Sequence, residues 1–207
     1  MEPIQPEDFM PDQALPNQTG PDDQTVSFVR MDRGTKEDYA LLGAREHDLI
    51  RQLPEFILAQ MKTLAMPGSG YKIDRYQHSL QTATRAFREG ADEETVVAAL
   101  LHDIGDTLAP DNHSQLAASL LRPYVSDKTY WVVQHHGIFQ GYYYFQHLGK
   151  DPNERDRFRG HPHFEDCVTF CERWDQMAFD PDYDTMPMEA FEPMLRRVLA
   201  REPFRQV

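Results

Sequence analysis

The segment EETVVAALLHDIGD, residues 93–106, constrains this chain more than any other. Its six consecutive apolar residues, 96–101, predict a helix that is buried on most of its faces. His102 and Asp103 follow this run directly, and an ionisable pair is costly to bury unless it is hydrogen-bonded or bound to a metal. Gly105 can end the helix there, because a residue without Cβ lets the backbone turn away. The segment therefore predicts that His102 and Asp103 are buried metal ligands. The alternative is a buried pair whose hydrogen bonds are made within the protein core, without a metal.

Helical spacing of apolar residues and well-placed caps predict helices along most of the chain. Strand-like alternation is absent, so we expect a single all-α domain over residues 34–207. A Pro-rich, acidic tail is expected over residues 1–33. The first helix should start at Thr35, carry Leu42, Leu49, Leu53 and Phe56 at helical spacing and be interrupted at Pro54. Further helices are expected over residues 74–88, 93–103, 113–122, 127–148, 163–178 and 188–201.

Composition excludes several classes of protein. Lys and Arg total 21 against 34 Asp and Glu, a net charge of -13, which argues against a nucleic-acid partner. No apolar stretch approaches about 18 residues, so we expect no membrane partner. The first residues lack the basic start and apolar run of a secretory signal. Cys167 and Cys171 are the only cysteines, so no disulfide framework is expected and a cytoplasmic location is the default.

More histidines and an aspartate lie at positions that suit a shared site. His78 lies one helix before the His-Asp pair, His113 opens the next helix, and the pair His135–His136 lies on the helix after that. Asp175 follows in a later helical segment. One histidine on each successive helix, with a late carboxylate, is how a helical bundle builds a site from facing helices. Imidazole nitrogen and carboxylate oxygen suit iron, manganese, zinc or nickel alike.

The order of these residues resembles that of the HD-domain superfamily of metal-dependent proteins. More narrowly, it resembles the mixed-valent di-iron oxygenases of that superfamily, which include myo-inositol oxygenase and the organophosphonate-cleaving oxygenases. The stretches His-Ser-Leu-Gln at 78–81 and Arg-Trp-Asp at 173–175 are similar to the second of these. The resemblance covers about residues 71–195 and favours His136 over His135 as a ligand. Two-metal HD phosphohydrolases can carry a similar set of ligands, so that class stays open.

The resemblance implies an HD-domain helical bundle that holds two metal ions bridged by Asp103. The resemblance implies that His78, His102 and Asp175 also bind the first metal. It implies that His113 and His136 also bind the second metal. In the oxygenases the metals are an Fe²⁺/Fe³⁺ pair that uses O2 to oxidise a carbon bearing a hydroxyl group. We therefore expect two iron ions as cofactors and a small molecule and O2 as partners, or another divalent metal if the chain is a hydrolase.

Three positions depart from the family pattern. Asp106 stands where many HD proteins carry Lys or His that can meet a phosphate oxygen. Tyr71 lies near the position of a Glu in the phosphonate-cleaving branch, and Gln140 replaces a Lys that often binds an anion. Together these differences predict a less anionic substrate, with a hydroxyl or a cationic group.

Other residues near the ligands are candidates for catalysis or substrate binding. Gln81 lies one turn after His78 and is expected to orient the substrate. Lys72 and Arg75 either supply positive charge or lie on a solvated surface. We interpret the remaining aromatic, histidine and cysteine motifs as packing or surface features: Tyr142, Tyr143, Tyr144, His161, His163, Cys167 and Cys171. The candidate catalytic residues are Asp103, Asp106 and Gln81, and the candidate substrate-binding residues are Tyr71, Lys72, Gln81, Asp106 and Gln140.

Three functions are compatible with these residues. We favour an iron-dependent oxygenase that acts on a small hydroxylated molecule. The alternatives are a metal-dependent phosphohydrolase acting on a phosphate ester and a non-catalytic HD module that binds a ligand or partner.

Overall fold

The computed structural model describes residues 24–204, so most of the predicted N-terminal tail lies outside the described residues. Within the described part the chain forms α-helices, short 3₁₀ turns and one π-helical turn, with no strand, and the all-α prediction is confirmed. No helix in this part is long and apolar enough to cross a membrane. The chain divides into two compact units, the first ending at Ile50 and the second beginning at Arg51. The predicted domain boundary after residue 33 stays a prediction.

The first unit contains a 3₁₀ turn, Met31–Arg33, and most of helix α1, Lys36–Arg51. Thr35 and Asp38 cap this helix reciprocally, because the Thr35 hydroxyl accepts from the Asp38 N–H at 3.2 Å and the Asp38 carboxylate accepts from the Thr35 N–H at 2.9 Å. The predicted start at Thr35 is therefore correct. The apolar side chains of Leu42 and Leu49 nevertheless remain exposed, at 37% and 56%.

The second unit contains the remaining helices. Asp74, Asp92 and Ser126 each cap a helix by accepting a hydrogen bond from the main-chain N–H three residues further on. The α-helices are α2 Leu53–Lys62, α3 Arg75–Arg88, α4 Glu93–Leu101, α5 His113–Leu121, α6 Asp127–Gln140, α7 Phe164–Phe170 and α8 Met188–Leu199. The 3₁₀ turns are Gly141–Tyr143, Phe145–Leu148 and Glu154–Phe158, and the π-helical turn is Cys171–Asp175.

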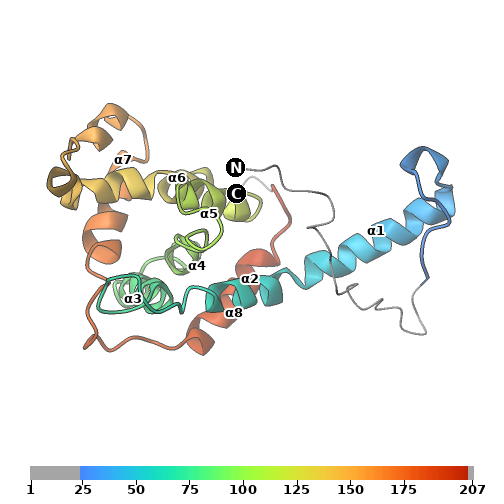
Figure 1. Ribbon diagram of the computed structural model, residues 1–207, viewed down its shortest axis with the longest axis horizontal. Coiled ribbons are helices and arrows are strands. Elements are labelled where there is room, and N and C mark those ends of the chain that lie inside the picture. The colour runs from blue at the N-terminus through green and yellow to red at the C-terminus, as the bar shows by residue number, and fades with distance from the viewer. Residues whose placement is uncertain (1–23, 205–207) are drawn as a thin grey trace, which may run out of the picture. The chain divides into compact units, whose positions relative to one another are not determined.

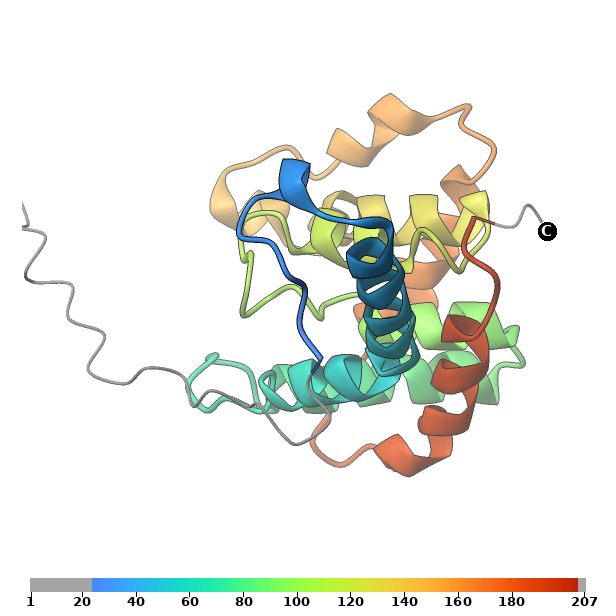
Figure 2. The same cartoon turned by 90° about the vertical axis from the view of Figure 1, so that its right-hand side faces the viewer.

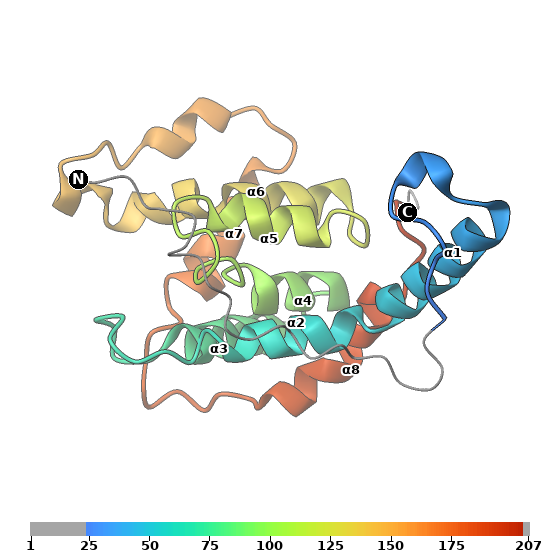
Figure 3. The ribbon, with the colours of Figure 1, turned by 45° about the vertical axis from the view of Figure 1, so that its right-hand side comes forward.

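Helix α4 lies in the middle of this unit, as its apolar sequence predicts. All six residues from Val96 to Leu101 are buried. Helices α3, α6 and α8 contact α4 (Figures 1 and 3). Helix α8 also contacts α2, and the two lie near each other in the view of Figure 2. The end of α4 therefore lies in the interior of the bundle. His102 and Asp103, which follow it, are buried there and need hydrogen bonds or a metal.

Two predicted helices end earlier than the sequence suggested. Helix α6 stops at Gln140 instead of continuing towards Leu148. The chain folds back at Gly141, where a Cβ would overlap the ring of Phe145, and it continues as 3₁₀ turns. The predicted helix over 163–178 is α-helical only to Phe170 and then changes to the π-helical turn.

Glu94 ties together the ends of three helices in the second unit. Its Oε1 accepts from the Ser126 N–H at 2.9 Å and from the Ser126 hydroxyl at 2.6 Å, at the start of α6. Its Oε2 lies 2.5 Å from Arg201 Nη1, just beyond α8. Burial alone would raise the pKa of Glu94, but these hydrogen bonds from Ser126, Thr129 and Arg201 outweigh it and lower the pKa.

We predict that Glu94→Gln destabilises the protein at neutral pH by about 1 kcal/mol, because it weakens charge-assisted hydrogen bonds. The pKa of Glu94 is lowered in the folded state, so its contribution is present above the unfolded value of 4.5 and is lost as the pH falls below it. Denaturant unfolding at pH 7 and at pH 4 should therefore show a smaller difference between wild type and variant at pH 4. An equal difference at both values would contradict this role for the Glu94 charge.

Candidate metal centre

The second unit brings together all six residues that the sequence suggested as metal ligands. They come from successive elements: the first turn of α3, the end of α4, the start of α5, the middle of α6 and the last position of the π-helical turn. Five of them are buried, and the side chain of His113 is 23% exposed. The six residues are His78, His102, Asp103, His113, His136 and Asp175.

Asp103 lies between two groups of ligands, and each of its oxygens faces a different group. Its Oδ2 lies 3.4 Å from His78 Nε2 and 3.3 Å from His102 Nε2. Its Oδ1 lies 3.4 Å from His113 Nε2 and 3.2 Å from His136 Nε2. This arrangement brings the residues together in the two groups that the family resemblance implies.

Asp175 completes the first group. Its Oδ1 lies 3.2 Å from His78 Nε2 and 3.6 Å from His102 Nε2. Its other oxygen, Oδ2, is buried and has no hydrogen-bond partner among the described residues. A carboxylate oxygen in that position is costly unless a cation binds nearby.

The main chain fixes the orientation of the histidine rings. The Nδ1 atoms of His78, His102 and His136 lie 2.7–2.9 Å from the carbonyl oxygens of Ala178, Ala99 and Val133. Each Nδ1 therefore donates its proton to a carbonyl, and each Nε2 of a neutral ring presents a lone pair to the centre.

Two of these lone pairs face each other at close range. His78 Nε2 lies 3.2 Å from His102 Nε2, and neither neutral ring has a proton to place between them. Two acceptors at this distance repel unless a positive charge lies close to both. A metal ion supplies that charge and accepts both lone pairs, so the donor set fits a metal better than it fits an uncharged core cluster.

The electrostatics of the buried residues also require positive charge. Burial disfavours a charged His102 ring, but Asp103 and Asp175 outweigh this effect and raise the pKa of His102 well above its usual value. Burial likewise opposes the Asp103 carboxylate, yet the surrounding imidazoles, led by His102, hold its pKa well below the usual range. The centre thus stabilises two carboxylates only when cations accompany them.

The π-helical turn determines where Asp175 lies. The N–H of Gln176 donates to the carbonyl of Cys171 at 3.0 Å, a bond that spans five residues instead of four. A π turn inserts an extra residue and so changes the face on which the following side chains lie. The sequence carries no recognised signal for this turn, and a regular helix was expected there.

A cavity of about 310 Å³ opens onto the centre. Asp103, His113, His136 and Asp175 form its inner wall. Its outer wall is largely aromatic and includes Tyr71, Tyr143, Tyr144 and Phe179, of which only Tyr71 is a predicted site residue. The only sequence signal for these aromatic residues was the run Tyr142–Tyr144, interpreted as packing.

Tyr71 and Gln140 line the cavity as the sequence suggested. Gln140 Nε2 donates to Asp175 Oδ1 at 3.0 Å, so its amide holds a ligand in place. Gln140 Oε1 is buried and has no partner among the described residues.

Three other predicted substrate contacts, Gln81, Lys72 and Asp106, do not line the cavity. Gln81 is buried, but its Nε2 donates to the carbonyl of Asp180 at 2.6 Å and its Oε1 accepts from the Asp180 N–H at 3.3 Å. It therefore holds the chain segment that follows the π-helical turn. Lys72 is exposed and lies outside the cavity wall.

Asp106 binds Arg75, and its Oδ1 lies 3.4 Å from His113 Nδ1. It lines a neighbouring cavity of about 450 Å³ and not the cavity at the metal centre. Arg75 Nε donates to Asp106 Oδ2 at 2.5 Å, and Arg75 Nη2 lies 3.5 Å from Asp103 Oδ2. Burial opposes the charge of Arg75, but Asp103 and Asp106 outweigh it and raise its pKa, so the guanidinium stays charged. The sequence could not decide between a surface and a site position for Arg75, and the structure places it at the cavity wall.

The structure places His136 in the centre and His135 away from it. The ring of His135 stacks on Trp131 at 4.3 Å, and its Nδ1 lies 2.8 Å from the Trp131 carbonyl oxygen. His161 also stacks on Trp131, with their ring centroids 4.1 Å apart. The two cysteines are buried and free, and Cys171 donates its S–H to the carbonyl of His136.

Comparison with known families agrees with this arrangement. The family model described as the HD domain matches residues 75–168, a range that holds five of the six clustered residues and stops before Asp175. None of the curated proteins compared with the chain matches it.

We predict a graded loss of metal when the clustered residues are replaced. Asp103→Ala should abolish metal binding because this carboxylate faces both groups of imidazoles, whereas His113→Ala, which changes one group only, should lower the metal content partly. Metal analysis of the purified variants measures this, and His135→Ala, outside the centre, serves as the matched control. Full metal content in Asp103→Ala would refute the assignment.

Proposed function

We propose that this chain is a di-iron oxygenase, because residues 75–168 match the HD-domain family model and a buried histidine–aspartate centre in the second unit fits metal ions. Its substrate would be a small hydroxylated molecule and its co-substrate O2. The observation that carries this proposal is the division of ligands by Asp103, whose two oxygens face two separate groups of imidazoles. A carboxylate in that position suits a bridge between two metals.

The six residues would hold the two iron ions. When bound, the iron pair supplies the activation of O2 and the oxidation of the substrate, which no side chain of the chain can perform alone. The protein contributes the position of the ligands, which the main-chain carbonyls fix through the histidine Nδ1 atoms. It also contributes a largely aromatic outer wall that limits the access of water to the centre.

Gln140 supports a hydroxylated substrate. The Asp175 carboxylate can only accept hydrogen bonds, so the Gln140 nitrogen must face it and the Gln140 oxygen must face elsewhere. That oxygen is buried without a partner, and leaving such an acceptor unsatisfied costs about 1–3 kcal/mol. A substrate hydroxyl that donates to Gln140 Oε1 would satisfy it.

The charges at the cavity wall argue against a phosphate ester. Among the described residues that line the cavity, Arg75 carries the permanent positive charge. Asp106 and Asp103 already neutralise it. A phosphate oxyanion would have to compete with two carboxylates for this guanidinium, which disfavours the phosphohydrolase alternative.

Anaerobic purification followed by metal analysis and EPR spectroscopy tests the proposal. We expect two irons per chain and a mixed-valent signal that changes when O2 is admitted. Zinc, manganese or nickel in place of iron, together with turnover of phosphate esters, would identify the phosphohydrolase instead.

We predict that Asp106→Asn increases the affinity for inorganic phosphate about tenfold, because it releases the Arg75 guanidinium from its closest partner. Isothermal titration of the metal-loaded protein with phosphate measures this. Asp111→Asn removes the same charge at an exposed position and should leave the affinity unchanged. An equal gain in both variants would mean that net charge alone, and not Arg75, sets the affinity.

A further inference from the structure

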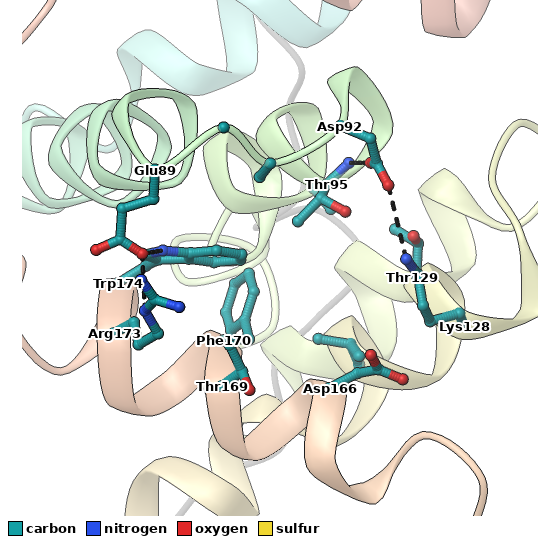
Figure 4. Close-up of a pocket in the computed structure, with 14 residues that line it drawn as sticks. Glu89, Asp92, Thr95, Lys128, Thr129, Asp166, Thr169, Phe170, Arg173 and Trp174 are labelled. Carbon is teal, nitrogen blue, oxygen red and sulfur yellow. Dashed lines mark hydrogen bonds and ion pairs between the residues drawn. The ribbon is translucent and has the colours of Figure 1, made fainter.

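A second cavity of about 250 Å³ lies in the same unit, lined by none of the residues that line the cavity at the metal centre (Figure 4). It is bounded by the turn between α3 and α4, by α6 and by α7 with the π-helical turn. The backbone and small side chains of Gly90, Ala91 and Ala98 form part of its wall, which leaves the space open. Gly90 has a φ of +78°, a conformation that other residues adopt with strain.

One wall of this second cavity is aromatic. Phe170 and Trp174 lie side by side there, with their ring centroids 5.8 Å apart in an edge-to-face arrangement. The indole N–H of Trp174 donates to Glu89 Oε2 at 2.7 Å, which fixes the orientation of the ring. This wall offers a fixed apolar surface to a flat molecule.

The lining also carries two cationic side chains, Arg173 and Lys128. Arg173 Nε contacts Glu89 Oε2 at 2.8 Å, but its terminal nitrogens have no partner among the described residues. Lys128 Nζ lies 3.6 Å from Asp92 Oδ2, which is longer than a hydrogen bond. Figure 4 shows the Arg173 and Lys128 side chains at opposite sides of the cavity.

Two of the three carboxylates at the rim, Glu89 and Asp92, already have hydrogen-bond partners. Glu89 accepts from both Trp174 and Arg173, and Asp92 accepts from the Thr95 N–H at 2.8 Å. Asp166 lies 3.4 Å from His163 Nδ1. Two cationic side chains with unused donors therefore face an apolar wall.

We propose that this second cavity binds a small organic carboxylate with a flat apolar body. The carboxylate pairs with the terminal nitrogens of Arg173, whose planar fork suits two parallel hydrogen bonds. The apolar body lies against Phe170 and Trp174. Lys128 adds positive charge from the other side of the cavity.

An occupant of this cavity contacts the elements that hold the metal centre. The Phe170 ring lies edge-on to the rings of His102 and His136, with centroids 5.6 and 6.3 Å away. Arg173 and Trp174 belong to the π-helical turn whose last residue is Asp175. A bound carboxylate thus stabilises one arrangement of that turn and acts as an effector of the centre.

Benzoate is a suitable probe, and tryptophan fluorescence reports its binding. The chain has two tryptophans, so Trp131→Phe leaves Trp174 as the reporter. In the metal-loaded protein we expect saturable quenching with a Kd on the order of 1 mM, because the few atoms of benzoate limit its binding free energy. Calorimetric titration of the wild type measures the same binding without relying on the Trp131 variant.

Matched variants locate the probe. Arg173→Gln should weaken benzoate binding about tenfold by removing the ionic hydrogen bonds, and Thr169→Phe should abolish it by filling the cavity. Arg75→Gln, at the wall of the other cavity, should leave the affinity unchanged. Absence of saturable binding, or a loss of affinity in Arg75→Gln but not in Arg173→Gln, would overturn the proposal.

A second measurement tests the action on the centre. Benzoate should change the rate at which a chelator removes metal from the wild type severalfold, and it should have no effect in Arg173→Gln at the same concentration. Equal rates with and without benzoate in the wild type would overturn the effector role.

Discussion

The need to neutralise two buried carboxylates organises this protein. Asp103 and Asp175 are 3% and 2% exposed, and a charge at that depth is very costly without a cation or hydrogen bonds. The surrounding imidazoles present lone pairs, so they bring no positive charge of their own unless they are protonated. Metal binding resolves both problems at once, and it explains why the chain gathers four histidines around the two carboxylates.

The rest of the bundle serves to hold these groups at fixed places. Helix α4 is buried along its whole apolar run, so its end delivers His102 and Asp103 to the interior. Gly105 lets the start of α5 come close, because a Cβ there would lie 2.8 Å from the carbonyl oxygen of His113. Carbonyls at the ends and within the helices bind the histidine Nδ1 atoms, and Gln140 binds Asp175. The second cavity adjoins the same support, through the π-helical turn.

Much of the centre could be predicted from the sequence because its ligands carry local signals. His102 and Asp103 interrupt an apolar helix, and the other histidines follow one per helix, in an order similar to a known family. Residues that pair by an ion pair or a hydrogen bond across a long stretch of the chain carry no such local signal. Arg75 and Asp106 were treated as separate residues, although they form one ion pair. Gln81 was read as a substrate contact because it shares a helix with His78, but its amide binds the main chain of Asp180, 99 residues away.

Local sequence patterns were sufficient to predict the all-α class, most helix starts and which histidines and aspartates cluster. These features depend on local patterns: caps, the spacing of apolar residues and the cost of burying an ionisable pair. Packing between distant segments sets where α6 ends, places Asp175 at the end of a π-helical turn and determines which oxygen of Asp103 faces which histidines. Each of these depends on how side chains distant in sequence approach one another, and that approach is settled by packing in three dimensions.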